Sequence, residues 1–198
     1  MELIVVRHGR TAWNAERRFQ GHADPPLDAV GRSQAARIST ALAGEAVEFV
    51  VTSDLRRARE TATAIAAAHG LAPEADPRWR EFSFGAWEGL TWTEICARDP
   101  ALRSAPWTSY THYAAPGGED FEALRARVAP AVEELRRRGA ACGALVAHAG
   151  SIHALLHCVL GSDDPHLIVP LDPGGITRLT MDETTAEITS LNDLSHFD

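Results

Sequence analysis

The N-terminal segment places an arginine, a histidine and a glycine directly after a run of apolar residues. Leu3 to Val6 are leucine or β-branched, a pattern typical of a strand that is covered on both faces in a parallel sheet. Ligands bind at the carboxyl ends of the strands in such sheets, and Arg7 and His8 follow at that end. The arginine could bind an anion, and the neighbouring imidazole could attack it. Arg-His-Gly alone is also consistent with a charged turn.

Two later apolar runs end in a similar way. The segment "VVTSDLRRA" leaves a predicted strand and begins a helix with Arg56 and Arg57 in its first turn. Positive charge there opposes the helix dipole, which suggests an anion at the helix start. The segment "LVAHAGS" ends a strand at His148, and Gly150 then opens a helix whose free N–H groups can receive an oxyanion. Together with the first strand end, these segments predict a cluster of arginine and histidine side chains around an anion.

The composition limits the class of protein. The length of 198 residues with 45% hydrophobic residues predicts a single domain over residues 1–198 with a sizeable core. A net charge of -8 argues against nucleic acid or an anionic membrane as partner, and no apolar segment approaches the roughly 18 residues of a membrane helix. The 3 cysteines lack metal-ligand spacing and indicate a reduced, cytoplasmic protein. All 19 basic residues are arginine, which excludes P-loop and Schiff-base enzymes because both need lysine.

Strands and helices alternate along the chain, which predicts an α/β sandwich with a largely parallel sheet. Strands are expected at residues 2–6, 47–53 and 143–148, helices at 31–42, 54–70, 121–139 and 151–161, and an edge hairpin within 175–192. Every cluster residue above then follows the end of a strand.

The segment at about 99–118 breaks this alternation. It is rich in proline and carries the side chains of Trp107, Tyr110, His112 and Tyr113. A connection of this length and composition often caps a site, although a loop pinned by its own aromatic residues is an alternative. As a cap, these side chains would suit a neutral, ring-bearing leaving group better than a small anion.

Several motifs together resemble the histidine phosphatase superfamily, also called the phosphoglycerate mutase-like family. They are "RHG", "RTAWN", "FQG", "SDLRRARETA", "EFSFGAWEG" and "AHAGSIHALL", with the "PGGED" element of the smaller phosphatase branch. They occur in the order of the family and span residues 4–156. The resemblance implies a three-layer α/β sandwich, mostly parallel with helices on both faces, and a covalent phosphohistidine mechanism.

The resemblance also assigns roles to individual residues. His8 would be the nucleophile, with Glu81 as the proton donor. The phosphate pocket would consist of Arg7, Arg57 and His148. The substrate-binding residues would be Thr11, Asn14, Gln20, Gly21, Ala149 and Gly150. The ligand would be a small phosphate ester, and no metal or cofactor is implied.

The chemistry accounts for these residue types. A phosphate ester is an anion that repels nucleophiles, so the two arginines and His148 would neutralise it. His8 must attack as a neutral imidazole through one nitrogen, while its other nitrogen donates to a carbonyl. Like-charge repulsion from Arg7 and Arg57 should lower the pKa of His8 and keep it unprotonated.

Some residues depart from the pattern or admit a second interpretation. His153 and His157 could join His148 as metal ligands, but their helix is otherwise apolar and core or rim positions are favoured. Arg10 replaces a residue that is often acidic or Gln in the family, and it either contacts the substrate or faces solvent. The lysine position of the mutases corresponds to Trp92, which favours a phosphatase.

Two alternatives remain. One is a cofactor-dependent phosphoglycerate mutase, and the other is a pseudoenzyme that binds phosphorylated ligands without turnover. The presence of both His8 and Glu81 argues against the pseudoenzyme. The sequence leaves the identity of the ester open, and it leaves a homodimer open.

Overall fold

A mixed six-stranded sheet lies at the centre of the computed structural model, which describes residues 1–104, 115–162 and 169–198. Its strand order is β3-β2-β4-β1-β5-β6. The strands are β1 (Glu2–Arg7), β2 (Val50–Thr52), β3 (Glu74–Ala75), β4 (Cys142–Ala147), β5 (Ile176–Met181) and β6 (Ala186–Asp193). The pairs β1–β4, β4–β2 and β2–β3 are parallel, whereas β5 and β6 are antiparallel. The mostly parallel sheet with a hairpin at its edge is therefore confirmed.

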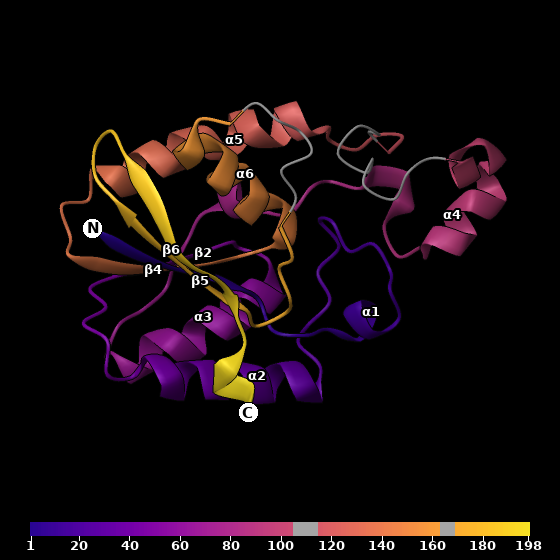
Figure 1. Cartoon of the computed structure of the whole chain (residues 1–198). Helices are drawn as coiled ribbons and strands as arrows, with labels where there is room; N and C mark the ends of the chain where they lie inside the picture. The colour runs from indigo at the N-terminus through magenta and orange to yellow at the C-terminus, as the bar shows by residue number, and fades with distance from the viewer. Residues whose placement is uncertain (105–114, 163–168) are drawn as a thin grey trace.

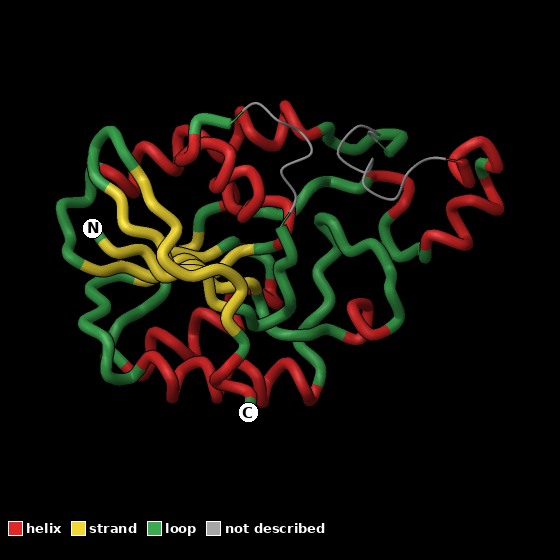
Figure 2. The backbone as a smooth tube through the Cα atoms, viewed as in Figure 1, coloured by secondary structure: helices red, strands yellow, loops and turns green. Residues whose placement is uncertain are grey.

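Helices cover both faces of this sheet (Figure 1, Figure 2). On one face lie α2 (Ala29–Leu42) and α3 (Arg56–Ala68), and on the other lie α5 (Phe121–Arg136) and α6 (Ala149–Leu160). The shorter α1 (Ala12–Ala15) and α4 (Trp92–Arg98) lie to one side, beyond the end of β1. Short 3₁₀ turns occur at Pro77–Trp79, Gly85–Trp87, Pro100–Ser104 and Ser195–Phe197. The three layers agree with the predicted sandwich.

Strand β1 shows why the sheet is buried on both faces. Leu3 and Val5 pack in a cluster with residues of α5 and α6, whereas Ile4 and Val6 pack with residues of α2 and α3. None of these four side chains is more than 1% exposed. Burial of each stabilises the fold by about 1.5–3 kcal/mol. Because alternate residues face opposite layers, the strand carries no polar side chain between Glu2 and Arg7.

The expected elements differ from the observed ones mainly at their ends, whereas α1, α4 and β3 were not predicted. The strand expected at 47–53 is reduced to Val50–Thr52, and the helix expected at 151–161 begins earlier and spans Ala149–Leu160. Pro130 lies inside α5, and the helix continues beyond it. Helix ends depend on local capping bonds rather than on hydropathy, so sequence periodicity places them poorly.

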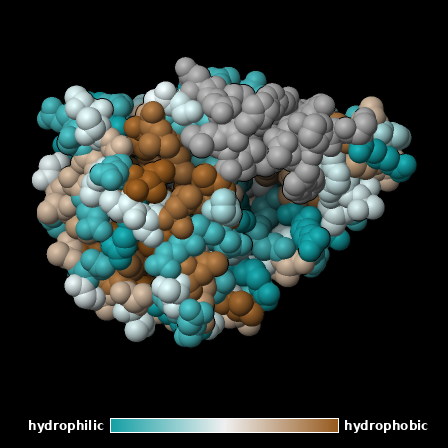
Figure 3. Space-filling model, in the orientation of Figure 1, coloured by the Kyte–Doolittle hydropathy of each residue, from teal (hydrophilic) through white to brown (hydrophobic). Residues whose placement is uncertain are grey.

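The predicted cap at about 99–118 falls partly outside the described residues. Residues 105–114, which include its aromatic side chains, are not described, and its role as a cap stays a prediction. On the surface that Figure 3 shows, hydrophobic side chains gather beside these grey atoms, and hydrophilic ones cover much of the remaining face. Among the described helices, none is long and apolar enough to cross a membrane.

Candidate active site

The register of β1 and β4 brings the two predicted site histidines together. Arg7 lies opposite Ala147 in this parallel pair, and the backbone N–H of His8 donates to the Ala147 carbonyl at 3.0 Å. His8 and His148 therefore leave the sheet side by side. Their ring centroids are 5.0 Å apart, and both residues are buried.

The His8 ring is held as a neutral nucleophile. Its Nδ1 lies 2.7 Å from the Gly9 carbonyl oxygen, which can only accept, so Nδ1 carries the proton and Nε2 keeps its lone pair. Burial, followed by the charges of Arg57 and Arg7, lowers the pKa of His8 well below 6.5. The lowered pKa predicted from the sequence is confirmed, although burial contributes more than the arginines do.

The Arg57 guanidinium is fully buried and fixed by hydrogen bonds. It donates to the carbonyl oxygens of Gly21 and Ala23, both at 2.8 Å, and its Nε donates to Nδ1 of His148 at 3.2 Å. Burial lowers its pKa to about 10, so the group stays charged at neutral pH. Arg57 thus contributes a rigid positive charge at the floor of the site.

His148 has the opposite tautomer to His8. Because Arg57 can only donate, Nδ1 of His148 must accept, and the proton of the neutral ring sits on Nε2. This buried Nε2 has no hydrogen-bond partner among the described residues. Burial and then the charge of Arg57 lower the pKa of His148 well below 6.5. His148 does not itself line the cavity that Arg7, His8 and Arg57 line, so donation of this N–H to a ligand stays a prediction.

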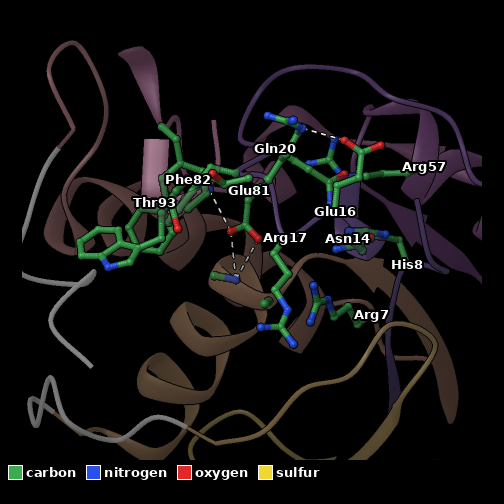
Figure 4. Close-up of a pocket in the computed structure, with 17 residues that line it drawn as sticks. Arg7, His8, Asn14, Glu16, Arg17, Gln20, Arg57, Glu81, Phe82 and Thr93 are labelled. Carbon is green, nitrogen blue, oxygen red and sulfur yellow. Dashed lines mark hydrogen bonds and ion pairs between the residues drawn. The ribbon is translucent and has the colours of Figure 1, made fainter. Parts of the chain in front are cut away.

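Arg7 lies at the mouth of the same site. Its side chain donates to the carbonyl oxygen of Leu171, and its own carbonyl accepts from the Gly174 N–H at 3.0 Å. Arg7, His8 and Arg57 all line one cavity (Figure 4).

Glu81 sits at the N-terminus of α6. Its Oε1 accepts from the backbone N–H groups of Gly150 and Phe82, both at 2.9 Å. A β-carbon at position 150 would lie 2.1 Å from this oxygen, so only glycine allows the approach. We expected the Gly150 N–H to receive a substrate oxyanion, but it holds the Glu81 carboxylate against the cavity wall instead.

Helix α3 also differs from the expectation of an anion held by two arginines. Its first N–H, that of Arg56, donates to the Asp24 carboxylate at 2.6 Å, and the Arg56 side chain pairs with Glu60 at 2.6 Å. Adjacent helical residues point about 100° apart, so only Arg57 of the pair faces the site. The helix start binds a carboxylate of the protein itself.

The predicted substrate-binding residues divide into two groups. Asn14, Gln20, Ala149 and Gly150 line the cavity, but Thr11 and Gly21 do not. The fully buried Thr11 hydroxyl lies 3.0 Å from the side-chain oxygens of both Asn14 and Gln20.

Gly21 supports the site through its carbonyl bond to Arg57, and its φ of 54° suits glycine. Thr11 and Gly21 therefore position other groups, and their predicted contact with the substrate stays a prediction.

The loop that carries Glu81 is fixed from behind by a charged pair. Arg127 of α5 donates to the carbonyl oxygens of Arg80 and Glu81, both at 3.1 Å, and pairs with Glu119 at 2.8 Å. Glu119 in turn accepts from the Ser83 N–H at 2.9 Å. The charged residues of the "PGGED" element and α5 thus act on the backbone around Glu81.

Other candidate residues take structural positions. Arg10 pairs with Asp28 at 2.8 Å and does not line the cavity. His153 Nε2 lies 2.9 Å from the Val169 carbonyl oxygen, and His157 also bonds a backbone carbonyl. Within residues 1–104, 115–162 and 169–198, no group of three His, Cys, Asp or Glu side chains could hold a metal ion.

The cavity measures about 660 Å³, a size suited to a small metabolite. Its wall includes residues that sequence reasoning did not select, among them Glu16, Arg17, Arg18 and Thr93. Trp92, which the sequence related only to a missing lysine, also lines it. Glu16, Arg17 and Arg18 lie between the "RTAWN" and "FQG" motifs, and this position between two site motifs is the signal that could have identified them.

A buried neutral histidine beside two arginines and a second imidazole, at the ends of parallel strands, defines a site for phosphoryl transfer. The chain belongs to the histidine phosphatase superfamily (branch 1), whose family model matches residues 3–194. The resemblance inferred from the motifs is thus confirmed, and with it the phosphatase class.

Three comparisons locate the chain within this family. A glucosyl-3-phosphoglycerate phosphatase of Mycolicibacterium vanbaalenii is 38% identical over 167 residues, which are 80% of this chain and 74% of that protein. A probable phosphoglycerate mutase of Yersinia enterocolitica is 33% identical over 162 residues, 81% and 75% of the two chains. A mycobacterial glucosyl-3-phosphoglycerate phosphatase, solved in complex with VO3, superposes with a TM-score of 0.87 at 32% identity over 96% of this chain and 98% of the other.

Proposed function

We propose that the protein is a metal-independent phosphomonoesterase that acts on a small phosphorylated metabolite through a phosphohistidine at His8. The observation that carries the proposal is the pairing of tautomers at the strand ends. His8 presents a lone pair on Nε2, and His148 presents a proton on Nε2. One ring can therefore attack a phosphorus atom while the other donates to a phosphoryl oxygen.

The phosphoryl group binds between Arg7, Arg57 and His148. Two guanidinium groups and a neutral N–H offset the charge of the phosphate, which is the role that a metal ion plays in other phosphatases. Asn14 and Gln20 line the same cavity and add amide groups for hydrogen bonds. The clamp is strongly cationic although the whole chain has a net charge of -8, so the attraction is local.

The reaction proceeds in two transfers. Nε2 of His8 attacks the phosphorus in line with the ester oxygen, the P–O bond breaks, and the leaving oxygen takes a proton from Glu81. The carboxylate of Glu81 then accepts a proton from water as the water oxygen attacks the phosphohistidine. The P–N bond breaks, inorganic phosphate leaves, and His8 and Glu81 return to their initial states.

The similar proteins support a phosphatase that acts on a phosphorylated hydroxy acid or sugar derivative. Two of them are glucosyl-3-phosphoglycerate phosphatases. Trp92 lines the cavity at the position where the mutase pattern has lysine, which supports hydrolysis over the phosphoglycerate mutase reaction. The free cysteines Cys96, Cys142 and Cys158 support a location in the cytoplasm.

The test is to trap the covalent intermediate. Rapid quenching with a radiolabelled phosphate ester should give protein-bound label that is labile in acid and stable in alkali, and peptide mapping should place it on His8. His8→Ala should lose both label and turnover, whereas Arg59→Gln, an exposed change on α3, should lose neither. Label on a serine or cysteine would refute the mechanism. Turnover should also persist in EDTA.

A further inference from the structure

The backbone of Arg17 has an unusual conformation at the edge of the active-site cavity. Helix α1 ends in a Schellman motif, in which the N–H of Arg18 donates to the Trp13 carbonyl at 2.8 Å and that of Arg17 to the Asn14 carbonyl at 3.2 Å. Arg17 occupies the left-handed position of this motif, with φ at 55°. Glycine is the usual residue there because a β-carbon is strained. An arginine at a strained position beside a site points to a function of its side chain.

The Arg17 side chain is exposed, lines the cavity and makes no ion pair or hydrogen bond with any described residue. Figure 4 shows it pointing into the cavity on the side where Arg7 lies. The neighbouring Arg18 is different, because it binds Glu16 at 2.7 Å, Glu94 at 2.9 Å and the Gly89 carbonyl at 2.8 Å. The charge of Arg18 is therefore balanced within the protein, and that of Arg17 is not.

We propose that Arg17 binds a carboxylate on the leaving group of the phosphate ester. The proposal rests on the phosphatase function and narrows its substrates to phosphorylated hydroxy acids and their derivatives. Arg7 and Arg57 are assigned to the phosphoryl group, so in the described part of the wall Arg17 is the cation that remains for a second anion. One guanidinium matches one carboxylate in charge and in its paired hydrogen bonds.

Aromatic residues complete this outer part of the cavity. Phe19, Phe84 and Trp92 line it, so a ring or an apolar group attached to the acid can pack beside the carboxylate. The neutral leaving group expected from the sequence rested on aromatic residues within 105–114, which lie outside the described residues. The described wall instead adds a positive charge to the aromatic surface.

Two esters that differ in one group test the proposal. 3-Phosphoglycerate and glycerol 3-phosphate share their phosphate ester and differ in a carboxylate against a hydroxymethyl group. Arg17→Gly keeps the left-handed turn, and Arg17→Gln keeps a polar side chain. Both should reduce kcat/KM for 3-phosphoglycerate by about tenfold, mainly through KM, as expected for one charge-assisted hydrogen bond lost from uniform binding. Turnover of glycerol 3-phosphate should change less than about twofold in either variant, since the phosphate clamp is intact.

Arg59→Gln is the control for loss of one positive charge, because Arg59 is exposed on α3 and does not line this cavity. It should leave both esters unaffected. Equal losses for the two esters in Arg17→Gly would mean that the Arg17 side chain contacts the phosphoryl group or supports the fold, and would overturn the proposal. An unchanged kcat/KM for 3-phosphoglycerate would also overturn it.

Calorimetric titration separates this proposal from the phosphatase function. In His8→Ala, which cannot form the intermediate, 3-phosphoglycerate should bind about tenfold more tightly than glycerol 3-phosphate, and adding Arg17→Gly should abolish the difference. If neither ester is hydrolysed by the natural protein but this preference is observed, the proposed function fails and the carboxylate site stands. Equal affinities in His8→Ala would overturn the carboxylate site whatever the turnover.

Discussion

At the scale of single residues, the fold keeps several buried imidazoles uncharged, two of them in the site. His8, His148 and His153 are buried, and burial is the largest cause of the lowered pKa in each. In the unfolded chain each would bind a proton below pH about 6.5. The folded protein therefore retains three neutral rings that the unfolded protein would protonate.

This difference predicts a loss of stability in mild acid. Below pH about 6.5 the unfolded state binds more protons than the folded state, so the free energy of unfolding should fall as pH falls. Each histidine contributes at most about 1.4 kcal/mol per pH unit until its own folded pKa is reached. Urea unfolding between pH 7.5 and pH 5 measures the slope, and His153→Gln should reduce it. A free energy of unfolding that is constant over this interval would contradict the lowered pKa values.

The strain at Arg17 predicts a gain of stability when its side chain is removed. The left-handed conformation costs a residue with a β-carbon roughly 1–2 kcal/mol, and glycine adopts it freely. Arg17→Gly should therefore raise the free energy of unfolding by about 1 kcal/mol, less the greater entropy of glycine in the unfolded chain. Arg17→Ala is the matched control and should give little gain. If both variants unfold at the same urea concentration as the natural protein, the backbone at position 17 is not strained.

The sequence was sufficient to predict the site residues that lie at the ends of strands. Arg7, His8 and His148 follow apolar runs, and the register of the sheet then sets them side by side. The sequence did not distinguish residues that face the ligand from those that support them. Thr11 lies within a site motif but is buried behind Asn14, because the direction of a side chain depends on a capping bond that no periodicity reveals.

At the scale of elements, the site is assembled from segments that other segments hold in place. Arg127 on α5 binds the carbonyls of the loop that carries Glu81, and Glu119 binds both Arg127 and an N–H of that loop. The hydropathy of α5 predicted the helix but not this function, since the contacts join residues far apart in the chain. Arg127 and Glu119 are positioning residues for Glu81.

This arrangement predicts that Arg127→Leu lowers kcat and leaves KM nearly unchanged. The phosphate clamp of Arg7, Arg57 and His148 has no hydrogen bond to Arg127 among the described residues, so ester binding should persist while proton transfer by Glu81 weakens. We expect a loss of about tenfold to a hundredfold in kcat, as for other misplaced acid–base groups. Arg125→Gln, on the same helix but paired with Glu122, is the control. An ester with a better leaving group should recover most of the loss, and equal losses for good and poor leaving groups would indicate a general structural defect.

At the scale of the whole molecule, a cationic site at one end of the sheet can serve either of two reactions. One is hydrolysis of the phosphohistidine, and the other is transfer of its phosphoryl group to a second oxygen of a bound acid. The fold was predictable from alternating strands and helices, because burial of β1 on both faces requires helices on both sides. The choice between the two reactions depends on the outer wall of the cavity. That wall is formed by loops and short helices, whose sequence carries no periodic signal.

The described wall predicts net hydrolysis. A mutase must keep its phosphohistidine away from water and return the phosphoryl group to the bound acid, so it needs an enclosed site and several cations for the acid. Among the described lining residues, Arg17 is the cation left for the acid, and Trp92 falls where the resemblance places the lysine of the mutases. Inorganic phosphate should therefore appear faster than 2- and 3-phosphoglycerate interconvert, even with 2,3-bisphosphoglycerate present. Phosphorus NMR follows both reactions in one sample, with Arg59→Gln as the control for a changed surface charge. Equilibration of the two phosphoglycerates before phosphate accumulates would make the protein a mutase.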